Sequence, residues 1–245
     1  MILFYALIFF FGASLGSFYH VVGYRMPQNL NWVSDRSHCP HCQTQLKSYE
    51  LLPIISYVIQ RGMCRTCGTH IKFIYVLSEI VAGLLFLLPV LHYGLGGFES
   101  GAIYIAWAFA SLLIIVSVSD IYYCLIQNKV LLFWSLVLVT LYVLYPNYNV
   151  MSGLVGALTG FLTLYAVDKL SSLILKKETI GGGDIKLFGV VGFVLGVHSV
   201  LSAICFSSML ALVYVLLAKP KNELKAIQFA PFIAVASYIC LFVIK

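Results

Sequence analysis

The stretch AIYIAWAFASLLIIVSVSD, from Ala102 to Asp120, carries no charge before its last residue. As an α-helix that rises about 1.5 Å per residue, it crosses most of a hydrocarbon core about 30 Å thick. A charge at the end of such a run is costly unless it has a purpose, so Asp120 is a candidate functional residue from the outset. The stretch therefore predicts a membrane-spanning helix with a carboxylate at one end.

The composition extends this prediction to the whole chain. Of the 245 residues, 61% are hydrophobic and 10% are charged, whereas about 25% of the residues in a soluble domain are charged. We expect an all-α polytopic membrane protein of about eight spans, the first of them a retained helix because no cleavage site follows it. The other apolar runs are Ile2–Val22, Ile74–Leu91, Val130–Leu144, Leu154–Ile174, Ile185–Val197, Ser199–Leu217 and Phe229–Ile244.

The basic residues lie in alternate connections, as the positive-inside rule expects of cytoplasmic loops. The intervening loops, around 92–101, 145–150 and 196–198, contain neither lysine nor arginine. We therefore expect a multi-pass plasma-membrane protein with both termini outside and the first long loop in the cytoplasm. The basic loop residues are Arg25, Arg36, Lys47, Arg61, Arg65, Lys72, Lys129, Lys176, Lys177, Lys186, Lys219, Lys221 and Lys225.

The first long loop contains two Cys-x2-Cys pairs, CPHC (Cys39 and Cys42) and CRTC (Cys64 and Cys67). Two such pairs are typical of a four-cysteine structural zinc site, which would staple a loop too small to form its own core. Disulfides or a redox pair are the alternatives, but a reducing cytoplasm disfavours the former and no βαβ pattern supports the latter. The neighbouring histidines are expected to be bystanders.

These features divide the chain into three parts. Residues 1–24 form the first transmembrane helix, 25–73 a cytoplasmic cysteine-rich loop domain and 74–245 a transmembrane core. Gly-x3-Gly pairs, such as Gly12 with Gly16 and Gly156 with Gly160, predict helix faces that pack closely.

No purely structural role accounts for the acidic residues Asp120 and Asp184. The topology places both at cytoplasmic ends of spans, where they can meet. Two carboxylates facing across a water are the minimum for aspartyl hydrolysis, since one keeps a proton while the other acts as a base. Lys186 would bias which carboxylate keeps the proton. Asp168, beside Lys169 and near the cytoplasmic end of its helix, is expected to form a local pair or to snorkel to the membrane surface.

A glycine triplet, Gly181, Gly182 and Gly183, directly precedes Asp184. Glycines adopt positive φ readily and let another backbone approach closely. We therefore expect this triplet to bind an extended substrate, with Lys186 and Glu79 as further candidate substrate-binding residues.

At this point the sequence resembles a known family. The pattern Gly181-x-Gly183-Asp184 with Asp120 upstream, the stretch GSFYHVVGYRMP (Gly16 to Pro27) and RSHCPHC followed by LLPIISYVIQRGMCRTCG resemble the type IV prepilin peptidases, which are GxGD intramembrane aspartyl proteases. The resemblance covers nearly the whole chain, and its compact length is similar to competence-type members from Gram-positive bacteria.

The resemblance implies that Asp120 and Asp184 are the catalytic dyad. It implies that the substrates are prepilin or pseudopilin precursors, whose short basic leader is cut after a glycine at the cytoplasmic face. It further implies, for many members, N-methylation of the new N-terminus with S-adenosylmethionine.

Two other classes of function remain open. An ion or proton transporter would use the acids as ion sites, although no inverted repeat is visible. A metal-binding assembly scaffold would need only the cysteine loop. The net charge of +6 is explained by topology and by contact with anionic membrane lipids, so no nucleic-acid partner is expected; the sequence does not indicate an oligomeric state.

Overall fold

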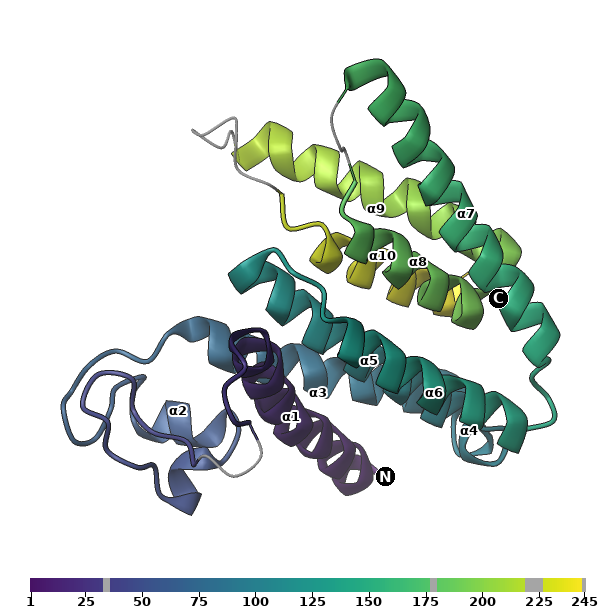
Figure 1. Ribbon diagram of the computed structural model, residues 1–245. Helices are drawn as coiled ribbons and strands as arrows, with labels where there is room; N and C mark the ends of the chain where they lie inside the picture. The colour runs from purple at the N-terminus through teal and green to yellow at the C-terminus, as the bar shows by residue number, and fades with distance from the viewer. Residues whose placement is uncertain (33–35, 177–179, 219–226, 244–245) are drawn as a thin grey trace.

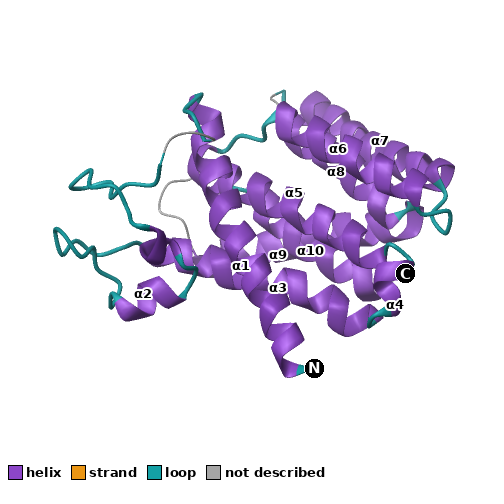
Figure 2. Ribbon diagram, turned by 90° about the horizontal axis from the view of Figure 1, so that it is seen from below, coloured by secondary structure: helices purple, strands orange, loops and turns teal. Residues whose placement is uncertain are grey.

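The computed structural model describes the chain except residues 33–35, 177–179, 219–226 and 244–245, and its described residues form helices and no strands (Figures 1 and 2). The predicted all-α class is confirmed. In chain order the helices are α1 (Ile2–Arg25), η1 (Met26–Gln28), η2 (Ser48–Leu51), α2 (Ile55–Ile59), α3 (Phe73–Tyr93), α4 (Gly96–Glu99), α5 (Ala102–Tyr123), α6 (Asn128–Leu144), α7 (Val150–Leu175), α8 (Gly182–Leu195), α9 (Val197–Ala218) and α10 (Ala230–Val243).

Each of the eight expected spans coincides with a helix, to within a few residues at either end. Within the described residues, five helices are long and apolar enough to cross a membrane, namely α1, α3, α5, α7 and α9. Helices α6, α8 and α10 have 17, 14 and 14 residues. At about 1.5 Å per residue these three helices are about 21–26 Å long, shorter than the hydrocarbon core of about 30 Å. The number of eight membrane spans therefore stays a prediction. Lys177, Lys219, Lys221, Lys225 and Ile244 lie outside the described residues.

Helix α5 is the centre of the bundle. In its most apolar window 83% of the residues are buried inside the protein, against 17–33% in the other four long helices. It packs against α1, α3, α6 and α10. Two polar contacts fix it to its neighbours: the Trp107 indole donates to the Phe86 carbonyl at 2.8 Å, and the Ser111 hydroxyl lies 2.9 Å from the Tyr19 hydroxyl.

Glycines allow two helix pairs to pack closely. A Cβ at Gly156 of α7 would lie 2.2 Å from the Gly192 carbonyl oxygen of α8, and one at Gly16 of α1 would lie 2.4 Å from the Ala82 Cβ of α3. The predicted small-residue faces are therefore confirmed. They join α1 to α3 and α7 to α8.

Local chain chemistry sets the ends of the helices on the second half of the bundle. The Asn149 side chain caps α7 by accepting from the Met151 N–H at 2.9 Å, as expected of an N-cap residue. Gly196, with φ 79°, separates α8 from α9 by a single residue. This left-handed conformation is one that glycine adopts at little cost. The sharp reversal lays α9 beside α8 (Figure 1).

Candidate functional site

The α5–α6 turn positions Asp120. Helix α5 ends at Tyr123, because Cys124 adopts a left-handed conformation with φ 50° and donates its N–H to the Asp120 carbonyl at 2.8 Å. The Ser119 hydroxyl donates to the Leu125 carbonyl at 2.6 Å. These bonds tie the chain back onto the last turn of the helix, so that Asp120 is held in a defined place.

The Asp120 carboxylate is buried, with 6% of the residue exposed. Its Oδ2 accepts a hydrogen bond of 2.9 Å from the backbone N–H of Ala230, the first residue of α10. The first N–H groups of a helix have no partner within the helix and carry partial positive charge, so a carboxylate is a favourable acceptor there. Asp120 is thus anchored through one oxygen at the junction of α5 and α10.

Asp184 lies in the first turn of α8, directly after the glycine triplet. None of the three glycines uses the positive φ that glycine permits: Gly181 has φ −64° and ψ 131°, and Gly182 and Gly183 are the first two residues of the helix. Gly183 is required for a packing reason instead, since a Cβ there would lie 2.8 Å from the Ile126 Cβ. Gly182 has open space around it.

The structure brings Asp120 and Asp184 together. Ile126, just beyond the end of α5, packs against Gly183, which directly precedes Asp184. A second contact joins the same elements, since the Lys186 ammonium donates to the Asn128 side-chain oxygen at 3.0 Å. Lys186 is therefore directed to the start of α6. The start of α8 is held against the α5–α6 turn by both contacts.

Asp168 has a partner other than the one we expected. Its Oδ1 accepts a 3.1 Å hydrogen bond from the Ile180 N–H, whereas the Lys169 ammonium lies 5.6 Å from the ring centroid of Tyr165. Ile180 directly precedes the glycine triplet. The Asp168 side chain, on α7, thereby fixes the segment that enters α8 and leads to Asp184.

Glu79 of α3 binds backbone rather than facing open space. Its Oε2 accepts a 2.8 Å hydrogen bond from the N–H of Ile54, a residue with a positive φ of 62°. The residue is 9% exposed. Glu79 thus anchors the loop between α1 and α3 to the bundle, and its role in substrate binding stays a prediction.

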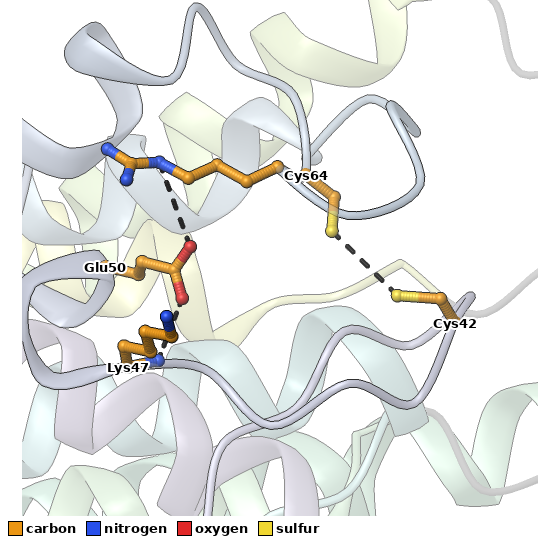
Figure 3. Close-up of polar contacts among 5 residues, drawn as sticks. Cys42, Lys47, Glu50 and Cys64 are labelled. Carbon is orange, nitrogen blue, oxygen red and sulfur yellow. Dashed lines mark hydrogen bonds and ion pairs between the residues drawn. The ribbon is translucent and has the colours of Figure 1, made fainter.

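The four loop cysteines converge, as predicted. Their sulfurs all lie within 4.8 Å of one another, with 3.9 Å between Cys39 and Cys67 and 4.0 Å between Cys42 and Cys64. Figure 3 shows the last pair facing each other from two separate turns. Four sulfurs around one ion at about 2.3 Å would be about 3.8 Å apart, so the cluster fits a tetrahedral metal ion.

The two cysteine turns repeat one local structure. The Cys39 N–H donates to the Thr44 carbonyl at 3.0 Å and the Cys64 N–H donates to the Thr69 carbonyl at 2.9 Å. The fourth residue after each first cysteine, Gln43 or Gly68, has a positive φ of 58° or 69°. Hydrogen bonding with Thr69 lowers the pKa of Cys67 to about 6, which favours the thiolate that a metal ion binds.

A groove of about 400 Å³ lies between α3, α5 and α10, beside the helix turn that carries Asp120. Its lining is almost wholly apolar, with one polar corner. There the Ser78 hydroxyl donates to the Tyr75 carbonyl at 2.7 Å and lies 3.0 Å from His20 Nδ1. The Tyr122 hydroxyl is 3.5 Å from His20 Nε2. No local sequence pattern marks this corner.

Sequence reasoning also missed the backbone partners of the acids. The partners are the backbone N–H groups of Ala230, Ile180 and Ile54, and no side-chain property at these positions indicates that role. The one available signal was positional, since Ile180 directly precedes the glycine triplet and Asp168 ends the preceding span.

These features define the class: an all-helical membrane protein with two neighbouring acids at helix ends and a four-cysteine centre in a loop. Residues 10–93 match the family model described as the bacterial Peptidase A24 N-terminal domain, and residues 107–216 match the type IV leader peptidase family. A prepilin leader peptidase/N-methyltransferase of Bacillus subtilis (strain 168) is 38% identical over 95% of this chain and 91% of its own length. The chain belongs to the type IV leader peptidase family.

More distant relatives carry the same name. The protein from Stutzerimonas stutzeri is 28% identical over 94% of this chain and 87% of its own, and that from Aeromonas hydrophila is 27% identical over 98% and 90%. No solved structure shows significant similarity to the chain.

Proposed function

We propose that the protein is an aspartyl endopeptidase that removes the leader of prepilin-like precursors, with Asp120 and Asp184 as the catalytic pair. The observation that carries the proposal is that the end of α5, which bears Asp120, and the start of α8, which bears Asp184, are held together by the packing of Ile126 against Gly183. Family membership and the names of the relatives support the reaction and the substrate class. The competence-type assignment rests on the resemblance in length alone.

In the proposed mechanism a water molecule attacks the carbonyl carbon of the scissile peptide bond. Asp120, held by the Ala230 N–H through one oxygen, accepts the water proton, and Asp184 gives its proton to the carbonyl oxygen. Collapse of the resulting diol breaks the C–N bond: Asp120 gives the proton that it took from water to the leaving amine, and Asp184 takes a proton back from a diol hydroxyl. The open space around Gly182 supports a place for the substrate backbone beside Asp184.

We propose zinc as the ion of the four-cysteine centre, because tetrahedral thiolate coordination is its preferred structural site. Its role is to fix the two cysteine turns, so that residues 25–73 form a loop domain between the first helix and the core of residues 74–245. We further propose that this domain and the two aspartates face the cytoplasm, with both termini outside the plasma membrane, since the basic residues follow that pattern.

N-methylation of the new N-terminus is proposed from the names of the relatives. S-adenosylmethionine would supply the methyl group. The apolar groove between α3, α5 and α10 does not suit the charged amino-acid part of that donor, so no residue is assigned to the step. Incubation of the cleaved product with the donor, followed by mass spectrometry of its N-terminus, tests the activity directly.

The experiment that tests the peptidase compares cleavage of a prepilin substrate in liposomes by wild type, Asp120→Asn and Asp184→Asn. Each variant should lose about 10³-fold or more in kcat/KM, within the range of acid–base catalysis. Glu99→Gln, an acid-to-amide change at an exposed residue of α4, is the matched control and should cleave normally. Full activity of either aspartate variant removes that residue from the pair, and a wild type that cleaves none of several prepilin substrates would favour the transporter or scaffold alternative.

A further inference from the structure

The loop between α1 and α3 exposes a set of large aliphatic side chains within a short stretch. Val58 is 67% exposed and Ile59 63% exposed. With Leu51, Leu52 and Ile55, which are 41–47% exposed, they make a contiguous segment that we call the apolar edge. Apolar surface of this kind is unfavourable in water and marks an interaction site.

The geometry of α2 gathers part of the apolar edge on one side. Ile55, Val58 and Ile59 are spaced three and four residues apart and so share one face of the helix. Tyr57 faces elsewhere, because its ring lies 6.5 Å from that of Phe73 and also packs closely against Gly62. The helix therefore has one face packed against the protein and one left uncovered.

The apolar edge lies next to an exposed apolar face of α3, part of which lines the groove described above. Phe73, the first residue of α3, is 59% exposed and contacts α2 through Tyr57. The exposed residues that follow it along this membrane-length helix share one face, and they are Leu77, Val81, Leu84 and Leu88. Both views place α2 beyond α1, on the side away from α7 and α8 (Figures 1 and 2). Helix α2 therefore lies beside the start of α3, a helix long and apolar enough to cross a membrane.

The charges around the apolar edge match an anionic surface. From residue 47 to 73 there are four basic side chains, Lys47, Arg61, Arg65 and Lys72, and one carboxylate, Glu50. Glu50 is already engaged, since it accepts from the Lys47 N–H at 2.8 Å and lies 3.9 Å from Arg65 Nε (Figure 3). Arg61 and Lys72 are exposed and flank α2 and the start of α3. Apolar side chains bordered by basic ones are typical of segments that lie in a membrane interface.

We propose that the apolar edge lies in the headgroup region of the bilayer, with Ile55, Val58 and Ile59 in the acyl boundary and Arg61 and Lys72 at anionic lipid headgroups. This contact, together with the Glu79–Ile54 hydrogen bond, holds the cysteine turns at the membrane surface. The proposal concerns lipid binding and does not depend on the peptidase chemistry.

The test places a genetically encoded, environment-sensitive fluorescent amino acid at position 58 of the full chain, and in a second protein at Thr66, an exposed position in the second cysteine turn. Both are reconstituted, one copy per nanodisc, with brominated phosphatidylcholine and phosphatidylglycerol. We expect a blue shift and bromine quenching at position 58 and neither at position 66. A Tm equal to that of the unlabelled protein shows that both labelled proteins are folded.

Three results would overturn the proposal. One is an unquenched, water-like emission at position 58. Another is equal quenching at both positions, which would place the whole loop in lipid. The last is a blue shift that appears only when two copies share a disc, which would assign the edge to a second copy of the chain. Arg61→Gln with Lys72→Gln should reduce the quenching at position 58 in discs with phosphatidylglycerol and leave it unchanged in pure phosphatidylcholine.

Discussion

Replacing Asp168 by alanine should impair cleavage although this residue lies outside the proposed catalytic pair. The substitution removes the acceptor of the Ile180 N–H, a contact of 3.1 Å that fixes the chain entering α8. Asp184 lies four residues further on, in the first turn of that helix. Without the contact the start of α8 samples other positions, and the two carboxylates meet in a smaller fraction of molecules.

The size of the effect follows from the kind of hydrogen bond that is lost. A bond to a charged group contributes about 1.5–3 kcal/mol. If that energy holds Asp184 in place, kcat/KM should fall about 10- to 100-fold, since 1.4 kcal/mol corresponds to a factor of ten. Asp168→Asn keeps an oxygen acceptor and loses only the charge, which is worth roughly half of the bond. It should lose about 3- to 10-fold.

The assay is prepilin cleavage in liposomes, with kcat and KM determined separately for each variant. The loss should lie mainly in kcat, because the displaced group is a proposed reacting carboxylate and not a binding surface. Lys169→Ala is the matched control on the same turn of α7, and its ammonium lies over Tyr165 instead of the glycine segment. Wild-type kcat in Asp168→Ala would refute the reasoning, as would an equal loss in Lys169→Ala.

Three further outcomes are expected. Gly192→Ala should lower Tm and expression, because the new Cβ would lie 2.2 Å from the Gly156 carbonyl oxygen. Gly189→Ala is the control and should be tolerated, since the nearest atom to its Cβ would be 3.7 Å away. Equal Tm values for the two variants would contradict this packing. Removal of the metal by a chelator, or Cys64→Ser, should increase proteolysis of the loop before it alters cleavage chemistry, and elemental analysis should then find less zinc per chain. Glu79→Ala should expose the same loop to protease more than Glu79→Gln, which keeps an acceptor for the Ile54 N–H; identical digestion patterns would count against this anchoring of the loop.

The fold could be predicted from the sequence largely because membrane spans are long and continuous signals. Burial in lipid requires apolar residues over the whole length of a helix, and that requirement located all eight helical segments. The number of complete crossings could not be predicted, since α8 and α10 are 14 residues each and α8 starts with a charged turn. The cysteine cluster was predictable for a different reason: residues of one chemistry at a fixed spacing can satisfy a single ion.

The candidate site was only partly predictable. The sequence indicates Asp120 and Asp184 because each is an acid at the end of an apolar run. From the sequence, the glycine triplet before Asp184 was explained by the backbone freedom of glycine. In the structure, Gly183 is needed because Ile126 occupies the space that a side chain at position 183 would fill. Contacts between distant segments leave no local pattern, so the packing of Ile126 against Gly183 could not be predicted from the sequence.

The hydrogen bond from the Ala230 N–H to the Asp120 carboxylate brings α10 into the candidate site. The two family models match residues 10–93 and 107–216, and Ala230 lies beyond both. Nevertheless α10 gives its first backbone N–H to the buried carboxylate at 2.9 Å, and it also packs against α5, α8 and α9. A buried carboxylate without that donor would lose a charge-assisted bond worth about 1.5–3 kcal/mol. The donor is a main-chain group, so it constrains the position of α10 and leaves the identity of residue 230 free. The last helix is therefore part of the site even though its sequence need carry no recognisable motif.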